Sequence, residues 1–245
     1  MLSLLCRPGV IDTRPWPPFG LLHGNWHDGS CWQPLVESLR TRGHGAVAPD
    51  LPYDDPNTGF QERVAPALGA LESVSGPVVV VGHSVSSGYA ALVANARPGS
   101  LLVHLCPRLD PFRPPAGAPT TFREGFPFPP RNEDGAMVWD TEKAIDAMYP
   151  RLPPETARAL AERLRPGAPP AGEYPLPGHP DVPPVLIYAT DDEIFNPDWE
   201  RFMARELLGI EPIEIPGGHF PMVEDPESLA DLLDRVVREH AASQD

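Results

Sequence analysis

The chain has 245 residues, a length that suits a single α/β domain with a full hydrophobic core. Its net charge of −15, from 19 basic and 34 acidic residues, argues against nucleic acid as a partner, because a phosphate backbone would be repelled. No apolar run approaches the roughly 20 residues of a membrane-spanning helix, and the start of the chain lacks the features of a signal peptide. We therefore expect a cytoplasmic protein whose first residues belong to the fold and which has no membrane partner.

Short apolar runs alternate with amphipathic stretches along the chain. Strands are predicted at 19–24, 45–50, 77–84, 100–106, 184–190 and 210–218, and helices at 31–43, 60–74, 85–96, 197–209 and 225–240. Alternating strands and helices imply parallel pairing through right-handed crossovers. The valine run at 78–81 has no polar alternation, which indicates that both faces of this strand are covered. The pattern predicts an α/β fold, a three-layer helix–sheet–helix sandwich with a mostly parallel sheet of about six strands.

Residues 107–180 break this alternation. They contain 17 of the 35 prolines, and short helices are predicted only at 141–149 and 154–165. A long insertion that follows a parallel strand is typical of a lid or a binding loop. We therefore expect a core formed by residues 1–106 and 181–245, with residues 107–180 as a Pro-rich cap.

A sharp turn is predicted where the strand at 77–84 passes directly into a helix. Such a turn lifts Ser84 above the sheet at a helix N-terminus and requires small neighbours, as in the G-x-S-x-G nucleophile elbow. Gly82 fits this motif, whereas Ser86 stands where the motif has glycine. The extra hydroxymethyl group is a modest intrusion, which weakens the motif without cancelling it.

A base and a carboxylate follow the next two strands of the pattern. His219 comes after the last strand and two glycines, and Asp191, Asp192 and Glu193 come after the strand before it. The carboxyl ends of parallel strands share one edge of the sheet, so these side chains are expected near Ser84. The order serine, acid, histidine indicates a nucleophile, a base that activates it and a carboxylate that orients the base.

The tetrahedral oxygen of an acyl transfer needs two backbone N–H donors. Val85, directly after the nucleophile, supplies one, and Asn25, in the loop after the first strand, is the expected second donor. His23 in the same loop is interpreted as a structural histidine. For His27 and Asp28 two interpretations are open: they line the pocket, or they form a solvated loop pair, which is the preferred interpretation.

Four further side chains are candidates for a substrate pocket: Trp26, His83, Tyr149 and Phe220. Cys6, Cys31 and Cys106 have no CxxC spacing, so we expect buried, reduced thiols and neither a disulfide framework nor a zinc site. The chain contains no HExxH, Walker or GxGxxG motif, and no metal or other cofactor is expected.

Four stretches carry a resemblance to a known family: "HGNWHDGSCW", "VVGHSVSSG", "YATDDEIFNPDW" and "PGGHFPMVEDPESLADLL". The sequence resembles the α/β-hydrolase superfamily, in particular its compact HG-x-W bacterial esterase-like group. The resemblance implies Ser84 as nucleophile, His219 as base and an oxyanion hole made by the amides of Asn25 and Val85. Outside the insertion it covers nearly the whole chain.

The family pattern also implies which carboxylate is the acid. It places the acid three residues after the position of Ala189, which selects Asp192 and leaves Asp191 as the alternative. Ala189 and Ser86 both replace glycines that are common in relatives.

These observations predict a cofactor-free serine hydrolase that cleaves carboxylic esters of small, largely apolar molecules through an acyl-enzyme. One alternative is a tailoring enzyme of secondary metabolism on the same scaffold: a C–C hydrolase, a lyase or a thioesterase. Lyases of this group use a lysine near the site, and the only lysine here is Lys143, in the insertion. A slow hydrolase-like ligand receptor is the other alternative. The expected partner is a small-molecule substrate, and a homodimer is left open.

Overall fold

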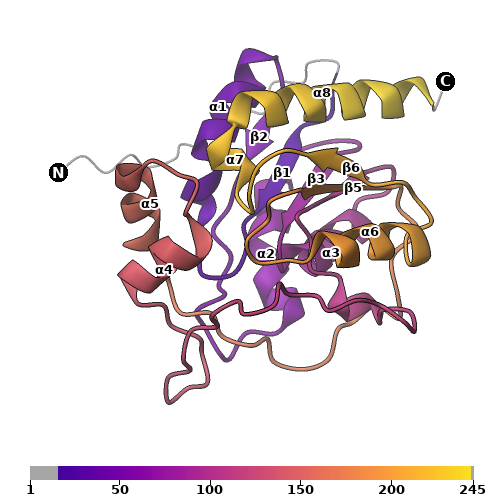
Figure 1. Cartoon of the computed structure of the whole chain (residues 1–245). Coiled ribbons are helices and arrows are strands. Elements are labelled where there is room, and N and C mark those ends of the chain that lie inside the picture. The colour runs from indigo at the N-terminus through magenta and orange to yellow at the C-terminus, as the bar shows by residue number, and fades with distance from the viewer. Residues whose placement is uncertain (1–15, 244–245) are drawn as a thin grey trace.

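A six-stranded sheet runs through the molecule, and every neighbouring pair of strands is parallel (Figure 1). The computed structural model describes residues 16–243, so the expectations for Cys6 and the first residues lie outside the described part. The strand order is β2-β1-β3-β4-β5-β6. The strands are β1 (Phe19–Leu22), β2 (Ala46–Val47), β3 (Val79–His83), β4 (Leu101–Leu105), β5 (Pro184–Ala189) and β6 (Ile213–Ile215).

The helices that flank the sheet follow the predicted pattern closely. They are η1 (Gly29–Trp32), α1 (Gln33–Thr41), α2 (Phe60–Ala70), α3 (Ser86–Asn95), α6 (Pro197–Glu206), α7 (Pro221–Glu224) and α8 (Pro226–Ala242). The short helix α7 was not predicted, because four residues are too few to show a helical period. Strand β2 is shorter than predicted, since Pro49 has no N–H with which to continue the ladder.

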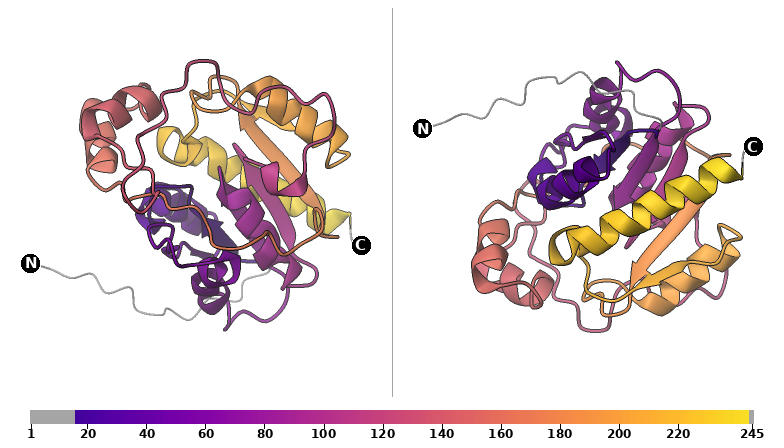
Figure 2. Two further views of the ribbon diagram at one scale, coloured as in Figure 1. Left: turned by 90° about the horizontal axis from the view of Figure 1, so that it is seen from below. Right: turned by 90° about the horizontal axis from the view of Figure 1, so that it is seen from above.

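The two faces of the sheet are covered by different helices. Side chains that point to one face, such as Val79 and Val81, pack with α1 and α8. Alternate residues such as Val80 point to the other face and pack with α2, α3 and α6. Figure 2 shows α8 lying across its face of the sheet. The predicted three-layer sandwich with an apolar strand β3 at its centre is therefore confirmed.

The connection between β4 and β5, residues 106–183, contains η2 (Asp110–Phe112), α4 (Thr141–Met148) and α5 (Pro154–Ala161). Helices α4 and α5 pack together at the left of Figure 1. Three backbone N–H groups of this connection donate to loops that follow β1, β2 and β5: Arg165 to the Trp26 carbonyl, Ala168 to that of Tyr53, and Arg123 to that of Ile194. The connection is thus hydrogen-bonded to the loops at the carboxyl edge of the sheet.

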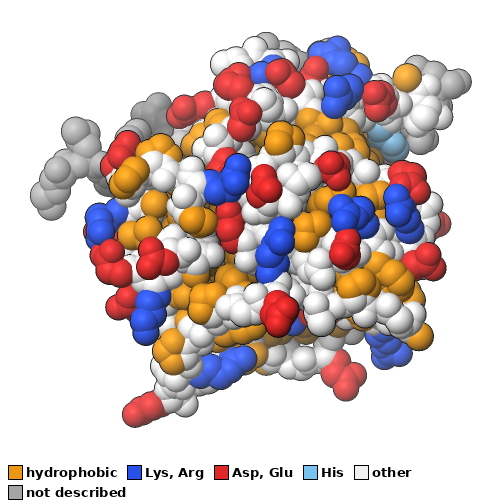
Figure 3. Space-filling model, viewed as in Figure 1, with side chains coloured by type: hydrophobic (Ala, Val, Ile, Leu, Met, Phe, Trp, Pro, Cys, Tyr) orange, Lys and Arg blue, Asp and Glu red, His pale blue; other side chains and the backbone are white. Residues whose placement is uncertain are grey.

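On the face drawn in Figure 3, acidic and basic side chains lie interspersed with hydrophobic ones. Among the described residues, none of the helices combines the length and the hydropathy that crossing a membrane requires.

Candidate active site

Ser84 lies in the sharp turn between β3 and α3, and its backbone is left-handed, with φ of +56°. A side chain in this conformation costs about 1–2 kcal/mol, which the surroundings must offset. The N–H of Ser84 donates to the carbonyl of Leu105 at 3.0 Å, and the carbonyl of Ser84 accepts from the N–H of Arg108, also at 3.0 Å. These bonds to the end of β4 hold the turn in place.

The residues two positions before and after Ser84 meet different demands. A Cβ at Gly82 would lie 2.6 Å from the Ala90 Cβ and 2.6 Å from the Ser86 carbonyl oxygen, so only glycine fits there. Ser86, in contrast, is fully buried and its hydroxyl donates to the carbonyl of His23. The Tyr53 hydroxyl donates to Ser86 Oγ at 2.5 Å. Ser86 therefore joins the start of α3 to the loop after β1.

His219 and Asp192 form a buried pair on the loops after β6 and β5. His219 Nδ1 donates to Asp192 Oδ2 at 2.6 Å, which leaves Nε2 as the nitrogen able to accept a proton. The other carboxylate oxygen, Oδ1, accepts the N–H groups of Ile194 and Phe195, each at 2.7 Å. Asp191 is exposed, and its ion pair with Arg151 spans 3.7 Å. The structure thus brings His219 to Asp192 and not to Asp191.

Two further carboxylates hold the loop that carries His219. The N–H of His219 donates to Glu193 Oε2 at 3.1 Å, and the N–H of Gly218 donates to Glu224 Oε2 at 2.8 Å. The carbonyl of His219 accepts from His83 Nε2 at 2.8 Å. Burial raises the pKa of Glu193. From the sequence, Glu193 is only a nearby acid and Glu224 has no predicted role, since nothing in the pattern says which backbone groups a carboxylate meets.

A small cavity of about 50 Å³, here called the Ser84 pocket, is lined by both Ser84 and His219. Of the residues expected at the oxyanion hole and substrate pocket, these also line it: Asn25, Val85, Trp26, His83 and Phe220. Its wall is otherwise mainly apolar, with side chains from the loop after β5 and from the β4–β5 connection. Tyr149 does not line the cavity and lies behind His27, to which its hydroxyl donates at 2.6 Å.

The backbone N–H groups of Asn25 and Val85 make no hydrogen bond to any residue between 16 and 243. Both residues line the Ser84 pocket. Stabilisation of a tetrahedral oxyanion requires two backbone donors near the serine hydroxyl, and these two residues meet that requirement in position.

The preferred interpretation of His27 as part of a solvated pair was wrong, and the alternative is confirmed, since His27 lines the Ser84 pocket. His27 is buried, because Tyr149 and Phe220 pack against its ring. Its Nδ1 donates to the Asn25 carbonyl at 2.8 Å, and burial lowers the pKa of His27 to about 4. A tyrosine 122 positions away in sequence thus supports the loop that carries Asn25, and no local pattern predicts that contact.

His23 has the structural role that was expected. It is buried, its Nδ1 donates to the Gly24 carbonyl at 3.0 Å, and its Nε2 accepts from the N–H of Leu51 at 2.9 Å. Burial lowers the pKa of His23 to about 4. The ring therefore stays neutral near pH 7 and braces the loops after β1 and β2.

Cys106 lies directly beneath the acid–base pair, at the end of β4. Its sulfur, a carboxylate oxygen of Asp192 and a ring nitrogen of His219 all lie within 4.8 Å of one another. Burial raises the pKa of the Cys106 thiol well above its ordinary value. Cys31 is also a buried free thiol, as predicted for both residues.

The chain is similar in sequence to one known protein family and to several characterised proteins. The model of the alpha/beta hydrolase family matches residues 21–232. A pyrethroid hydrolase of Sphingobium wenxiniae is 25% identical, with 87% of this chain and 85% of that protein covered. Methylesterase 18 of Arabidopsis thaliana is 28% identical, with 88% of this chain and 95% of that protein covered.

Solved structures agree on the fold. The crystal structure of a pyrethroid hydrolase from Sphingobium faniae superimposes with a TM-score of 0.70 at 22% identity, and covers 91% of this chain and 97% of that one.

Proposed function

The chain belongs to the alpha/beta hydrolase family, and on that premise we propose that it is a cofactor-free serine esterase. Relatives that are esterases support an ester hydrolase in general. The finer proposal is a catalytic triad of Ser84, His219 and Asp192 that acts on carboxylic esters of largely apolar molecules. One observation carries it: the hydrogen bond of 2.6 Å between His219 and Asp192, in a pair whose histidine shares a cavity with Ser84.

Acylation begins when the Ser84 oxygen attacks the ester carbonyl carbon and His219 Nε2 takes the hydroxyl proton. Asp192 keeps the proton on Nδ1 and stabilises the imidazolium that forms. The amides of Asn25 and Val85 donate to the tetrahedral oxygen, and the loss of one such donor raises a barrier by about 2.7–4 kcal/mol. His219 then protonates the departing alcohol, and the acyl group remains on Ser84.

Deacylation repeats these roles with water as the nucleophile. His219 removes a proton from the water as it attacks the acyl carbon, and returns that proton to the Ser84 oxygen as the acid leaves. The same two amides stabilise the second tetrahedral oxygen. Free Ser84 is regenerated, so an esterase turns over steadily. A receptor of the same fold would be acylated once, and steady turnover therefore distinguishes the two.

The proposal includes residues 107–180 as a cap over this site. Hydrogen bonds from this segment to the loops after β1, β2 and β5 support that role, as does its apolar contribution to the Ser84 pocket. A lyase that depends on lysine is disfavoured, since Lys143 lines a different cavity.

Substitution of the two candidate acids tests the triad. Asp192→Asn should lower kcat for p-nitrophenyl acetate by about 10⁴, because the imidazole loses its correct tautomer and its charge partner. Asp191→Asn is the matched control, one residue away on the surface, and should retain most of the activity. A larger loss of activity in Asp191→Asn than in Asp192→Asn would reject the assignment of the acid.

A further inference from the structure

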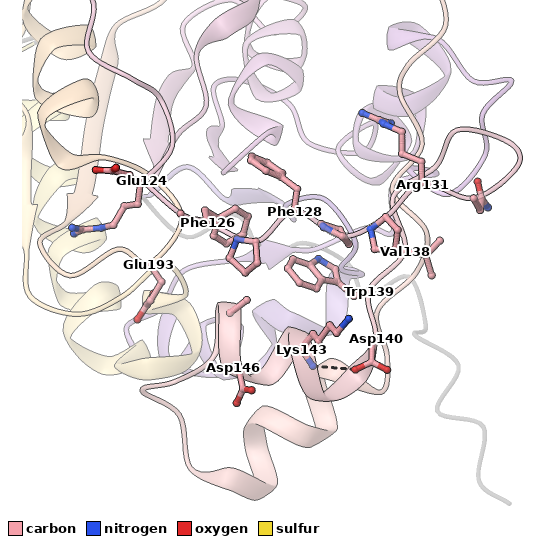
Figure 4. A pocket seen from close by; sticks show the side chains of 17 residues that line it. Glu124, Phe126, Phe128, Arg131, Val138, Trp139, Asp140, Lys143, Asp146 and Glu193 are labelled. Atoms are coloured by element: carbon pink, nitrogen blue, oxygen red, sulfur yellow. Dashed lines mark hydrogen bonds between the residues drawn. The ribbon is translucent and has the colours of Figure 1, made fainter.

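A second, much larger cavity lies outside the Ser84 pocket. This cavity, here called the outer groove, has a volume of about 1050 Å³ and is lined by residues 123–132, by Glu193, and by six residues on and before α4: Val138, Trp139, Asp140, Lys143, Asp146 and Ala147 (Figure 4). Pockets for drug-sized molecules have volumes of about 300–1,000 Å³. The outer groove is therefore large enough for a whole small molecule.

The outer groove and the Ser84 pocket share a wall. Phe128 lines both cavities. Phe122, which lines the Ser84 pocket, contacts Phe128 edge to face with ring centroids 4.7 Å apart. The N–H of Arg123 donates to the Ile194 carbonyl at 2.9 Å, and Ile194 also lines the Ser84 pocket. The segment 122–128 thus borders both the Ser84 pocket and the groove.

The outer groove gathers the most exposed large hydrophobic side chains of the described residues. Phe128 and Val138, 53% and 37% exposed, are the large hydrophobic side chains that are exposed between residues 16 and 243, and both line the groove. Phe126 links them to Trp139, with ring centroids 5.2 Å from Phe128 and 6.2 Å from Trp139. Exposed apolar surface gathered in one place marks a binding site.

The charges around the outer groove favour a neutral ligand. Three basic and four acidic side chains line it, so neither sign dominates. Figure 4 shows the rings of Phe126, Phe128 and Trp139 grouped together, with Lys143 and Asp146 on α4. A flat, uncharged group fits this aromatic wall, since ring stacking contributes in addition to burial of apolar area.

We propose that the outer groove binds a neutral aromatic group of about two rings on one side of the scissile ester, while the group on the other side is small and enters the Ser84 pocket. The volume of about 50 Å³ limits that second group, since one water molecule already needs roughly 10–15 Å³ of such cavity space. The proposal rests on the proposed esterase function and sharpens its substrate class. Phe128 lines both cavities, so an ester that extends from one cavity into the other lies beside its ring.

Two pairs of esters test this proposal: phenyl acetate against 4-phenylphenyl acetate, and methyl benzoate against methyl 4-phenylbenzoate. In at least one pair the two-ring ester should have a kcat/KM at least tenfold higher, and that pair shows which side of the ester occupies the groove. Val138→Trp and Ala147→Trp, which fill the groove from two sides, should each lower this ratio at least tenfold. Ala242→Trp adds the same side chain to the exposed end of α8, far from the groove, and should leave the ratio unchanged.

If the wild type turns over these esters, the proposal is overturned when neither pair favours the two-ring ester, or when both tryptophan variants lower the two members of a pair equally. Calorimetry with Ser84→Ala separates a failure of the groove from a failure of the esterase. It measures binding of the favoured two-ring ester, or of both two-ring esters if the wild type turns over neither. If the wild type has no esterase activity but Ser84→Ala binds a two-ring ester, and adding Val138→Trp weakens this binding at least tenfold, the groove is supported and the esterase is rejected. No binding to Ser84→Ala would reject the groove.

Discussion

Ser86 stands where the G-x-S-x-G motif has glycine, and its hydrogen bonds explain this departure. The sequence alone indicates that a serine is tolerated in place of glycine, but not that it makes bonds. Those bonds reach His23 and Tyr53, residues from the loops after two other strands. Gly82, in contrast, follows directly from the motif, since the close approach of β3 and α3 is local. At the scale of single residues, local geometry could be predicted and long-range partners could not.

Ser86→Ala should destabilise the fold, because the buried Tyr53 hydroxyl and His23 carbonyl both lose their partner. Leaving buried polar groups unsatisfied costs about 1–3 kcal/mol. Urea denaturation measures the free energy of unfolding. Ser87→Ala is the matched control: Ser87 is also buried in α3, but its hydroxyl makes a single bond of 3.2 Å to the Gly82 carbonyl. Equal stability of Ser86→Ala and the wild type would contradict this account.

At the scale of elements, the loop after β1 depends on the β4–β5 connection. Trp26 in this loop is left-handed, with φ of +68°, and its carbonyl accepts from the N–H of Arg165 at 2.8 Å. The Arg165 guanidinium donates to the His27 carbonyl at 2.7 Å and to the Leu51 carbonyl at 3.1 Å. The strands and helices could be predicted from their periods. The docking of residues 107–180 could not, because a Pro-rich segment has no period to read.

Arg165→Met should lower kcat while changing KM little, because a looser loop misplaces the Asn25 amide in the transition state. The fall should be smaller than the 10²–10³ caused by removing a whole oxyanion donor. Steady-state kinetics with p-nitrophenyl acetate measures both constants. Arg158→Met is the control, since the Arg158 guanidinium makes an exposed ion pair with Glu142, of a kind that contributes little. The same kcat in Arg165→Met and Arg158→Met would show that Arg165 does not position the loop.

At the scale of the whole molecule, burial of neutral histidines links stability to pH. The pKa is lowered mainly by burial in His23, His27, His83, His104 and His179. The unfolded chain binds protons at these positions below about pH 6.5, and the folded chain does not. Stability is therefore full above pH 6.5 and is lost as the pH falls from 6.5 toward 4. Buried Glu200 acts in the opposite direction, since burial raises its pKa.

His104→Leu isolates one of these histidines away from the Ser84 pocket, where His104 bonds His179 with 3.1 Å between their Nε2 atoms. Between pH 7.5 and 5.5 each histidine kept neutral by the fold should cost about 1.4 kcal/mol of stability. The loss of unfolding free energy over this range should therefore be smaller by about that amount in His104→Leu than in the wild type. An identical pH dependence in the two proteins would mean that His104 is not a source of acid sensitivity.

That Ser84, Asp192 and His219 lie at the same edge of the sheet could be predicted, because each follows the end of a parallel strand. The choice between Asp191 and Asp192 came from a family resemblance, since adjacent loop residues have no period that separates them. Cys106, beneath the pair, was recognised only as a buried thiol, because its neighbours come from other strands.

The most direct measurement is the reaction of the protein with a fluorophosphonate probe, followed by mass spectrometry of the intact chain and its peptides. We predict one added probe per chain, located on Ser84, with no labelling of Ser84→Ala and much slower labelling of His219→Ala. Labelling at another residue, or undiminished labelling of Ser84→Ala, would contradict the proposal that Ser84 is the nucleophile.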